Sequence, residues 1–189
     1  MRTLLITLLL VALLGVATAA EKSEKKAGPS PAVASPAKPA PEVSQLKYFA
    51  GIWQCEGTDF AGPMGPEHPM QQTVTARMDL DGFWLIQRLE EKKTKDNPHP
   101  IKGVYAFAFD PGQKKFVALW NDNSGGWASQ TSDGWEGDKF VLVGEYTGGG
   151  QKMPTRDVYV KKGAKELTHT VELKIKDQWS KAVEETCKK

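Results

Sequence analysis

Cysteine and histidine are scarce in this 189-residue chain, and several kinds of chemistry are excluded with them. The chain has 2 cysteines and 3 histidines, and it contains no CxxC pair, no CxxCH haem-attachment motif and no HExxH motif. It also lacks a nucleophile elbow and a phosphate-binding glycine loop. Paired carboxylates such as Glu90 and Glu91 are adjacent in sequence, so on a strand they point to opposite faces. The sequence therefore predicts no catalytic residue and no metal site, and it singles out no cofactor.

An excess of charge of one sign is also lacking. The chain has 25 Lys and Arg against 23 Asp and Glu, a formal net charge of +2 at pH 7. The lysines are spread through predicted turns instead of lying along one face. Neither a nucleic-acid-binding surface nor a surface for anionic membranes is predicted.

Long hydrophobic runs are confined to the first 20 residues. The apolar run from Leu4 to Val16 follows Arg2 and precedes Ala17-Thr18-Ala19, which is typical of a cleavable signal peptide. This run is too short to cross a bilayer comfortably, and no second run follows, so no membrane span is predicted. We expect residues 1–20 to be removed and the protein to be exported to a bacterial periplasm or secreted.

The next segment, residues 21–43, holds five of the 12 prolines and shows no apolar periodicity. This composition predicts an extended, disordered linker. Residues 44–189 then have the usual length of one domain.

Alternating apolar and polar residues recur throughout that domain. The predicted strands are 52–58, 71–79, 83–92, 101–110, 115–121, 126–131, 139–146, 153–161, 166–176 and 179–187. Turn residues such as Asp110-Pro111-Gly112 and Gly148-Gly149-Gly150 separate them, and only a short helical turn is expected, at 44–49. The pattern predicts an all-β fold, a closed antiparallel up-and-down barrel of eight to ten strands.

The two cysteines lie in the first and last predicted strands. These strands are neighbours in a closed up-and-down barrel, so Cys55 and Cys187 are predicted to form a disulfide in an exported protein. Closing such a long loop stabilises a fold by roughly 4–5 kcal/mol in the chain-entropy model.

The start of the first strand resembles a known opening. Gly51-Ile52-Trp53 after a short turn is similar to the start of calycin-superfamily barrels, which include lipocalins and nitrobindin-like proteins. In lipocalins this tryptophan closes one barrel end against an arginine on the last strand. The resemblance implies that Gly51 and Trp53 close the barrel here, although the end of this chain offers only Lys181, Lys188 and Lys189 in place of the arginine.

A series of short motifs is similar to DUF1579, a bacterial family of unknown function thought to be lipocalin-like. The matching residues, in order, are Gly51-Ile52-Trp53, Phe109-Asp110, Trp120-Asn121-Asp122, Asp133-Gly134-Trp135 and Arg156. The resemblance runs from Leu46 to the C-terminus and implies a lipocalin-like barrel. It supplies no catalytic residues.

His169 is the only histidine on an apolar face of a predicted strand. In nitrobindin-like barrels a histidine on a late strand binds haem iron, so the resemblance implies an iron ligand at this position. The alternative is a core histidine that is hydrogen-bonded to a neighbour.

Two arginines are also candidates for the interior. If Val158 and Val160 point inward, so does Arg156, and if Trp84 and Ile86 do, so does Arg88. A buried guanidinium needs an anionic partner, either an internal carboxylate or a ligand carboxylate. The predicted ligand-binding residues are His169, Arg156, Tyr105, Phe107, Trp120 and Leu173.

The long first loop, residues 61–70, lies where a barrel mouth is expected. Met64, His68 and Met70 are ligand types for soft metals such as copper. One histidine and two methionines rarely suffice for a metal site, so we interpret the loop as a lid.

Three functions are compatible with these features. The preferred hypothesis is an exported barrel that holds a small apolar molecule in its interior. The second is a nitrobindin-like haem protein with His169 as the iron ligand. The third is a ligand-free structural or interaction protein of the cell envelope with a solidly packed interior.

Overall fold

The structure is a computed structural model that describes residues 37–63 and 65–189. The predicted signal peptide and most of the predicted linker lie outside the described residues. Within the part of the chain that is described, no helix is both long and apolar enough to cross a membrane.

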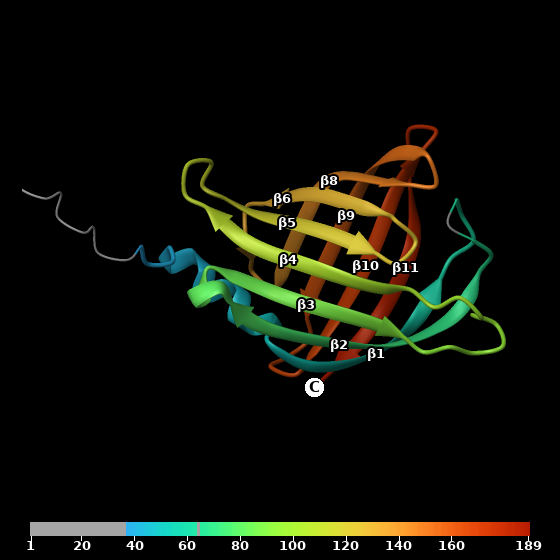
Figure 1. Ribbon diagram of the computed structural model, residues 1–189, viewed down its shortest axis with the longest axis horizontal. Coiled ribbons are helices and arrows are strands. Elements are labelled where there is room, and N and C mark those ends of the chain that lie inside the picture. The colour runs from blue at the N-terminus through green and yellow to red at the C-terminus, as the bar shows by residue number, and fades with distance from the viewer. Residues whose placement is uncertain (1–36, 64) are drawn as a thin grey trace, which may run out of the picture. The chain divides into compact units, whose positions relative to one another are not determined.

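Ten long strands run alternately up and down and close into an antiparallel barrel (Figure 1). The strands are β1 (Gly51–Asp59), β2 (His68–Asp79), β3 (Trp84–Glu91), β4 (Lys102–Asp110), β5 (Lys115–Asp122), β6 (Trp127–Ser132), β8 (Lys139–Gly148), β9 (Gln151–Lys161), β10 (Glu166–Ile175) and β11 (Gln178–Lys188). The ring closes because β1 pairs with β11 and β6 pairs with β8. The two-residue strand β7 (Trp135–Glu136) pairs only with β8. The predicted all-β barrel is therefore confirmed.

The helical segment is longer than predicted. A 3₁₀ helix, η1 (Pro41–Phe49), precedes β1, and a three-residue turn, η2 (Leu80–Gly82), joins β2 to β3. Val43 of η1 is buried, so residues 41–43 belong to the folded domain and not to the linker in which they were predicted. Proline is compatible with the first helical position because its missing N–H has no intrahelical partner there.

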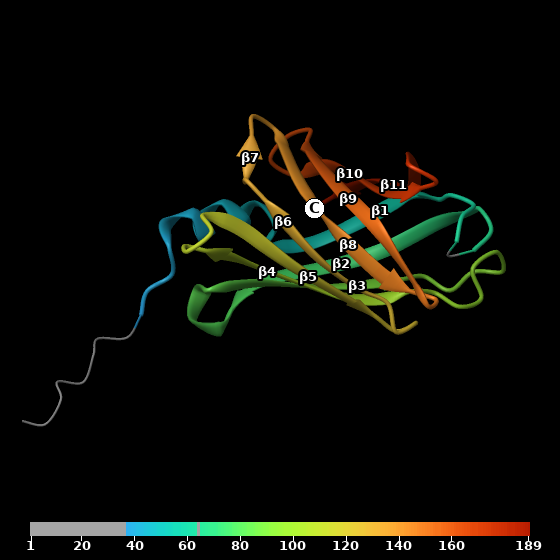
Figure 2. The same cartoon turned by 90° about the horizontal axis from the view of Figure 1, so that it is seen from above.

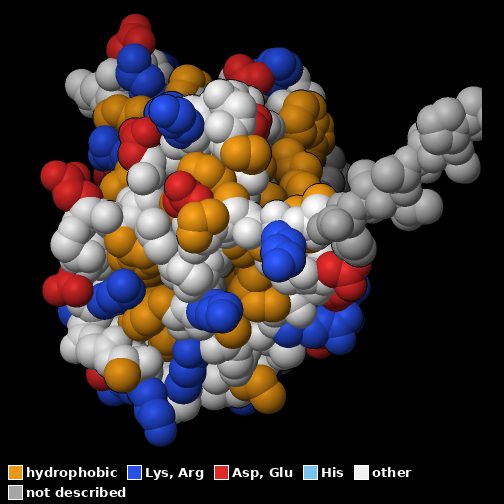
Figure 3. Space-filling view, turned by 90° about the vertical axis from the view of Figure 1, so that its left-hand side faces the viewer, with side chains coloured by type: hydrophobic (Ala, Val, Ile, Leu, Met, Phe, Trp, Pro, Cys, Tyr) orange, Lys and Arg blue, Asp and Glu red, His pale blue; other side chains and the backbone are white. Residues whose placement is uncertain are grey.

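The helix η1 lies across one end of the barrel (Figure 2), and buried hydrophobic side chains pack beneath it. Phe49 of η1 lies 5.3 Å from Trp135, 5.6 Å from Phe140 and 6.0 Å from Phe107, measured between ring centres. Leu46, Leu85 and Leu142 belong to the same hydrophobic cluster and are fully buried. Figure 3 looks onto this end, where hydrophobic side chains lie among charged ones. Aromatic burial of this extent makes the η1 end the main hydrophobic core.

The opposite end carries the loops between β1 and β2 and between β3 and β4, at the right of Figure 1. The shorter turns that follow β5, β8 and β10 end on the same side, since successive strands alternate in direction. This end has no helix across it among the described residues.

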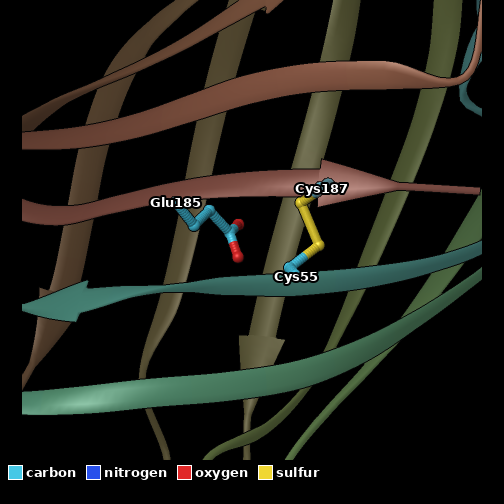
Figure 4. A group of neighbouring side chains, drawn as sticks. All are labelled: Cys55, Glu185 and Cys187. Atoms are coloured by element: carbon cyan, nitrogen blue, oxygen red, sulfur yellow. A yellow bond between two sulfur atoms is a disulfide. The ribbon is translucent and has the colours of Figure 1, made fainter.

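The predicted disulfide is present. Cys55 and Cys187 lie directly opposite each other on β1 and β11, with sulfur atoms 2.00 Å apart. Figure 4 shows the bond on the same side of these strands as the Glu185 side chain. The disulfide therefore joins the first and last strands from within the barrel, as expected for a closed meander.

Candidate ligand-binding cavity

A cavity of about 670 Å³ lies inside the barrel, and it extends from the loops at the open end down to Phe49 and Trp53 beneath η1. This volume lies in the range of small-molecule sites. Much of its wall is apolar, and examples are Val74, Leu89, Met70, Ala128 and Leu173. The barrel interior is therefore divided into a packed end and a hollow end.

A buried polar cluster crosses the wall of this cavity. We call it the His169 cluster, and it comprises Gln72, Gln130, Asp157, His169 and Glu185. All five are buried, and all but Gln130 line the cavity. The imidazole of His169 lies between two carboxylates, with Nδ1 2.8 Å from Glu185 Oε1 and Nε2 3.2 Å from Asp157 Oδ1. The other carboxylate oxygens accept amide hydrogen bonds, Glu185 Oε2 from Gln72 at 2.6 Å and Asp157 Oδ2 from Gln130.

These contacts determine the charge of the cluster. Burial alone would lower the pKa of His169, but the hydrogen bonds to Asp157 and Glu185, with their negative charges, raise it to about 9. His169 is therefore an imidazolium at neutral pH and donates from both ring nitrogens. Each carboxylate oxygen accepts a hydrogen bond, so the two acids act as anions and the cluster carries one net negative charge.

Strand register brings the cluster together. His169 on β10 lies directly opposite Glu185 on β11 and Tyr159 on β9. Tyr159 stacks on the imidazole with 4.1 Å between ring centres and an interplanar angle of 6°. Asp157 lies two residues before Tyr159 and so shares its inward face.

The polar chain continues to β4. The Tyr105 hydroxyl donates to Gln130 Oε1 at 2.6 Å, and Gln130 in turn donates to Asp157. Burial, reinforced by the charge of Asp157, raises the pKa of Tyr105 well above its ordinary value. Tyr105 therefore stays a neutral hydrogen-bond donor on the cavity wall.

A second acidic group lies nearer the mouth. Asp59, at the end of β1, has Oδ2 3.2 Å from His68 Nε2. Burial raises the pKa of Asp59 to about 7, and the charge of Glu91 and a hydrogen bond with it add to the effect, while His68 opposes it. Glu91 also accepts hydrogen bonds from Asn97 Nδ2 at 2.9 Å and from the Ile101 backbone at 2.7 Å, which fix it beneath the β3–β4 loop.

Trp120 forms an aromatic part of the wall, and its position depends on two neighbours. Its indole Nε1 donates to Asp122 Oδ2 at 3.0 Å, which explains the Trp-x-Asp pattern. A Cβ on Gly103 of the adjacent strand would lie 1.9 Å from the indole ring, so only glycine admits the ring there. Tyr105 lies 5.0 Å from Trp120 between ring centres and extends the aromatic surface.

A family model described as "Protein of unknown function (DUF1579)" matches residues 38–189. The chain belongs to the DUF1579 family. The barrel is also similar to the crystal structure of Rv2717c from M. tuberculosis, with a TM-score of 0.61 and 12% identity over 80% of this chain and 99% of that chain. Similarity at that level of identity shows the fold alone. No curated protein matches this sequence.

The family pattern in this DUF1579 protein is mainly structural. Asp110 accepts backbone hydrogen bonds from Gly112 and Gln113 and so shapes the β4–β5 turn. Trp135 donates from Nε1 to the Gln45 carbonyl at 3.2 Å and holds η1. The motifs therefore build the turns and the closed end of the barrel.

Four of the six predicted ligand-binding residues line the cavity of the DUF1579 barrel. They are His169, Tyr105, Trp120 and Leu173. Phe107 points inward but is fully buried in the packed end near Phe49.

Arg156, which was predicted to bind the ligand, does not point inward, and neither does Arg88. Arg156 lies on the outer face, where Nε is 2.7 Å from Glu172 Oε2 and Cζ is 4.6 Å from the centre of the Trp179 ring. Arg88 is exposed between the inward-facing Gln87 and Leu89. In β9 the inward positions belong to Asp157 and Tyr159, so the valines used to set the register face outward with Arg156.

Most of the His169 cluster was not predicted from the sequence. Asp157, Glu185, Gln72 and Gln130 are polar residues at inward positions of their strands, where alternation alone predicts apolar residues. One signal was available, since Glu185 lies two residues from Cys187 and a cross-strand disulfide fixes the inward face of β11.

Trp53 and Gly51 lie at the η1 end of this DUF1579 protein. Trp53 is 2% exposed, and its Nε1 donates to the Phe49 carbonyl at 2.8 Å. Gly51 has φ of 127°, which favours glycine at the turn from η1 into β1.

Residues of the types that bind metals lie near the cavity, but several already have other partners. Both ring nitrogens of His169 contact carboxylates, and the sulfur atoms of Cys55 and Cys187, close to Glu185, are bonded to each other. His68 and Met70 line the cavity, whereas Met64 lies outside the described residues. Pro63 and Pro66 of the loop at 61–70, and Phe60 just before it, also line the cavity, a position suited to a lid.

Proposed function

We propose that this DUF1579 protein is an exported binding protein that holds a small, largely apolar molecule in its barrel. The cavity of about 670 Å³, open at one end and sealed by η1 at the other, is the observation that carries the proposal. Its apolar wall would hold the body of the ligand, and the few buried polar groups would orient it. The open volume also favours this function over a solidly packed structural protein.

The disulfide supports export. Bonds such as Cys55–Cys187 persist in oxidising compartments and are rare in the reducing cytosol. Together with the signal-peptide pattern of residues 1–20, this supports a periplasmic or secreted location. N-terminal sequencing of protein recovered from the periplasm or the medium should begin near residue 20 or 21, and full-length protein confined to the cytosol would contradict export.

The geometry does not favour haem binding through His169. An imidazolium with both nitrogens hydrogen-bonded to carboxylates has no lone pair free for iron. Binding would require deprotonation of His169 and loss of at least one carboxylate contact. A Soret band after haem titration that disappears in His169→Ala would restore this alternative.

The proposed function is tested by filling the cavity. Ala128 on β6 is buried and lines the cavity, whereas its neighbour Ser129 is exposed on the outside. Ala128→Phe should abolish the fluorescence increase of the neutral dye N-phenyl-1-naphthylamine, and Ser129→Phe should leave it unchanged. Equal dye binding by both variants, or no binding by the unmodified protein, would overturn the proposal.

A further inference from the structure

The charged side chains of the cavity wall are almost all of one sign. Six carboxyl side chains line it: Asp59, Glu91, Asp96, Asp122, Asp157 and Glu185. Three histidines do so as well, but no lysine or arginine does among residues 37–63 and 65–189. The chain as a whole has a slight excess of Lys and Arg, so this segregation is a property of the cavity.

In the deep part of the cavity, negative charge exceeds positive charge. Asp157 and Glu185 share a single imidazolium, and their remaining oxygens are held by neutral amides of Gln72 and Gln130. Their hydrogen bonds are satisfied, but one negative charge has no counter-ion within the cluster. An electric field of that sign, inside low-dielectric walls, repels an anionic ligand and attracts a cationic one.

The acidic pair at the mouth adds to this field. Asp59 on β1 faces Glu91 on β3, His68 on β2 and, more distantly, Glu185 on β11. The pKa of Asp59 near 7 is a consequence of burial and of this crowding of carboxylates. A cation bound nearby would relieve the crowding.

The wall also offers aromatic faces suited to a cation. Trp120, Tyr105, Tyr146 and Phe60 line the cavity together with the carboxylates. Trp120 and Tyr146 both approach Asp122, at 3.0 Å from Nε1 and 3.5 Å from the hydroxyl, so negative charge lies beside the rings. Aromatic faces beside carboxylates are a recurrent means of binding ammonium groups.

We propose that the ligand is a hydrophobic organic cation, an apolar body that carries a protonated amine. The apolar body fills the space between Val74, Leu89 and Leu173, and the ammonium group lies near the carboxylates and the Trp120 ring. This inference rests on the proposed function, because it names the class of ligand for the same cavity.

Three naphthyl compounds that differ only in their polar group provide the test. They are 2-(1-naphthyl)ethylamine, 2-(1-naphthyl)ethanol and 3-(1-naphthyl)propionate, measured by displacement of N-phenyl-1-naphthylamine at about pH 8. The amine is still protonated at that pH, and Asp59 is largely ionised. We expect the amine to bind at least about tenfold more tightly than the propionate, the size of one moderate ionic contact.

The pH dependence of binding and two variants test whether Asp59 contributes to the preference for the amine. Between about pH 6 and pH 8 the affinity for the amine should rise as Asp59 ionises, while that for the alcohol stays constant. Asp59→Asn should flatten the rise, and the exposed Asp110→Asn at the other end of the barrel should not. Asn keeps the shape of Asp and removes only its charge.

The outcomes separate the two proposals. If the alcohol or the propionate displaces the dye as well as the amine does, the cation inference is wrong and the binding function stands. If neither the dye nor any of the three compounds binds, the binding function itself is wrong.

Discussion

Lys189 lies over Trp53, with Nζ 4.3 Å from the centre of the indole ring, and donates a hydrogen bond to the Tyr48 carbonyl at 2.8 Å. The ammonium group therefore connects the end of β11 to both η1 and β1. A lysine ammonium thus lies over the tryptophan to which the resemblance to lipocalins drew attention. The sequence showed only that no arginine lies near the end of the chain, and the structure places Lys189 over the ring.

Lys189→Ala should lower the free energy of unfolding by about 1 kcal/mol, because the cation–π contact and the hydrogen bond are both lost. Lys189→Arg should retain most of the stability, since a guanidinium can lie over the same ring. Guanidinium chloride unfolding measures both variants. Lys188→Ala is the control, because Lys188 makes only a long contact of 3.8 Å with Glu166, and an equal loss in that variant would contradict a specific role for Lys189.

Trp53→Ala should cost roughly 3–5 kcal/mol, because it leaves a large hole beneath η1 and removes the hydrogen bond to Phe49. The matched control is Trp179→Ala on the outer face, where the ring is 37% exposed and the loss should be about 1 kcal/mol or less. Urea unfolding followed by circular dichroism compares the two. Similar losses would mean that Trp53 does not hold the closed end together.

The disulfide can be tested by replacing both cysteines with alanine, which avoids a free thiol in the barrel. This variant should keep the fold and lose about 2–5 kcal/mol of stability, since the closed loop spans 132 residues of sequence. Thiol titration of oxidised unmodified protein should find no free thiol before reduction and 2 after denaturation and reduction. Two reactive thiols in oxidised protein would contradict the staple between β1 and β11.

The raised pKa of His169 predicts a loss of stability at alkaline pH. Its pKa is raised to about 9 in the folded protein from 6.5, so its contribution is complete below pH 6.5 and disappears as the pH rises through 9. The loss amounts to about 3 kcal/mol at most. NMR titration of the His169 ring measures the pKa directly, and a midpoint near the ordinary value would contradict the imidazolium assignment.

The raised pKa of Asp59 also makes the protein less stable as the pH rises, but over a lower pH range. Its pKa is raised from 3.8 to about 7, so the folded protein holds this proton more tightly than the unfolded chain does. Stability should therefore decline between about pH 4 and pH 7 as well, and Asp59→Asn should remove that part of the decline. Unfolding free energies measured across this range in both proteins provide the comparison.

The strands were predictable because their signals are local. Each of the ten long strands overlaps a predicted one, since alternation and turn residues such as Asp110 and Gly112 act over a few positions. The short β7 was not predicted, because two residues are too few to show an alternation of apolar and polar side chains. The extent of η1 also escaped, because prolines in a polar segment do not reveal that Val43 will be buried.

The inward faces were harder to predict. On β10 the alternation is clear, and His169 was placed correctly on the inner face with Leu167 and Leu173. On β9 both faces carry apolar residues. The valines suggested the wrong face as the inner one, and Arg156, which shares their face, was therefore placed inside. A shift of one residue exchanges the two faces of a strand, and only pairing with β8 and β10 fixes which face is inside.

The sequence by itself determined the strands and their order, the positions of the turns and the pairing of Cys55 with Cys187. Strand periodicity and turn residues are local properties of the chain, and an up-and-down order makes the first and last strands neighbours. Only the tertiary structure decided that Asp157, His169 and Glu185 meet. Acidic residues are stable inside a barrel only when partners on neighbouring strands satisfy them, and those partners are remote in sequence. The tertiary structure also decided how the interior is divided into a packed end and a cavity, because this depends on how side chains from all ten strands and η1 fill the same space.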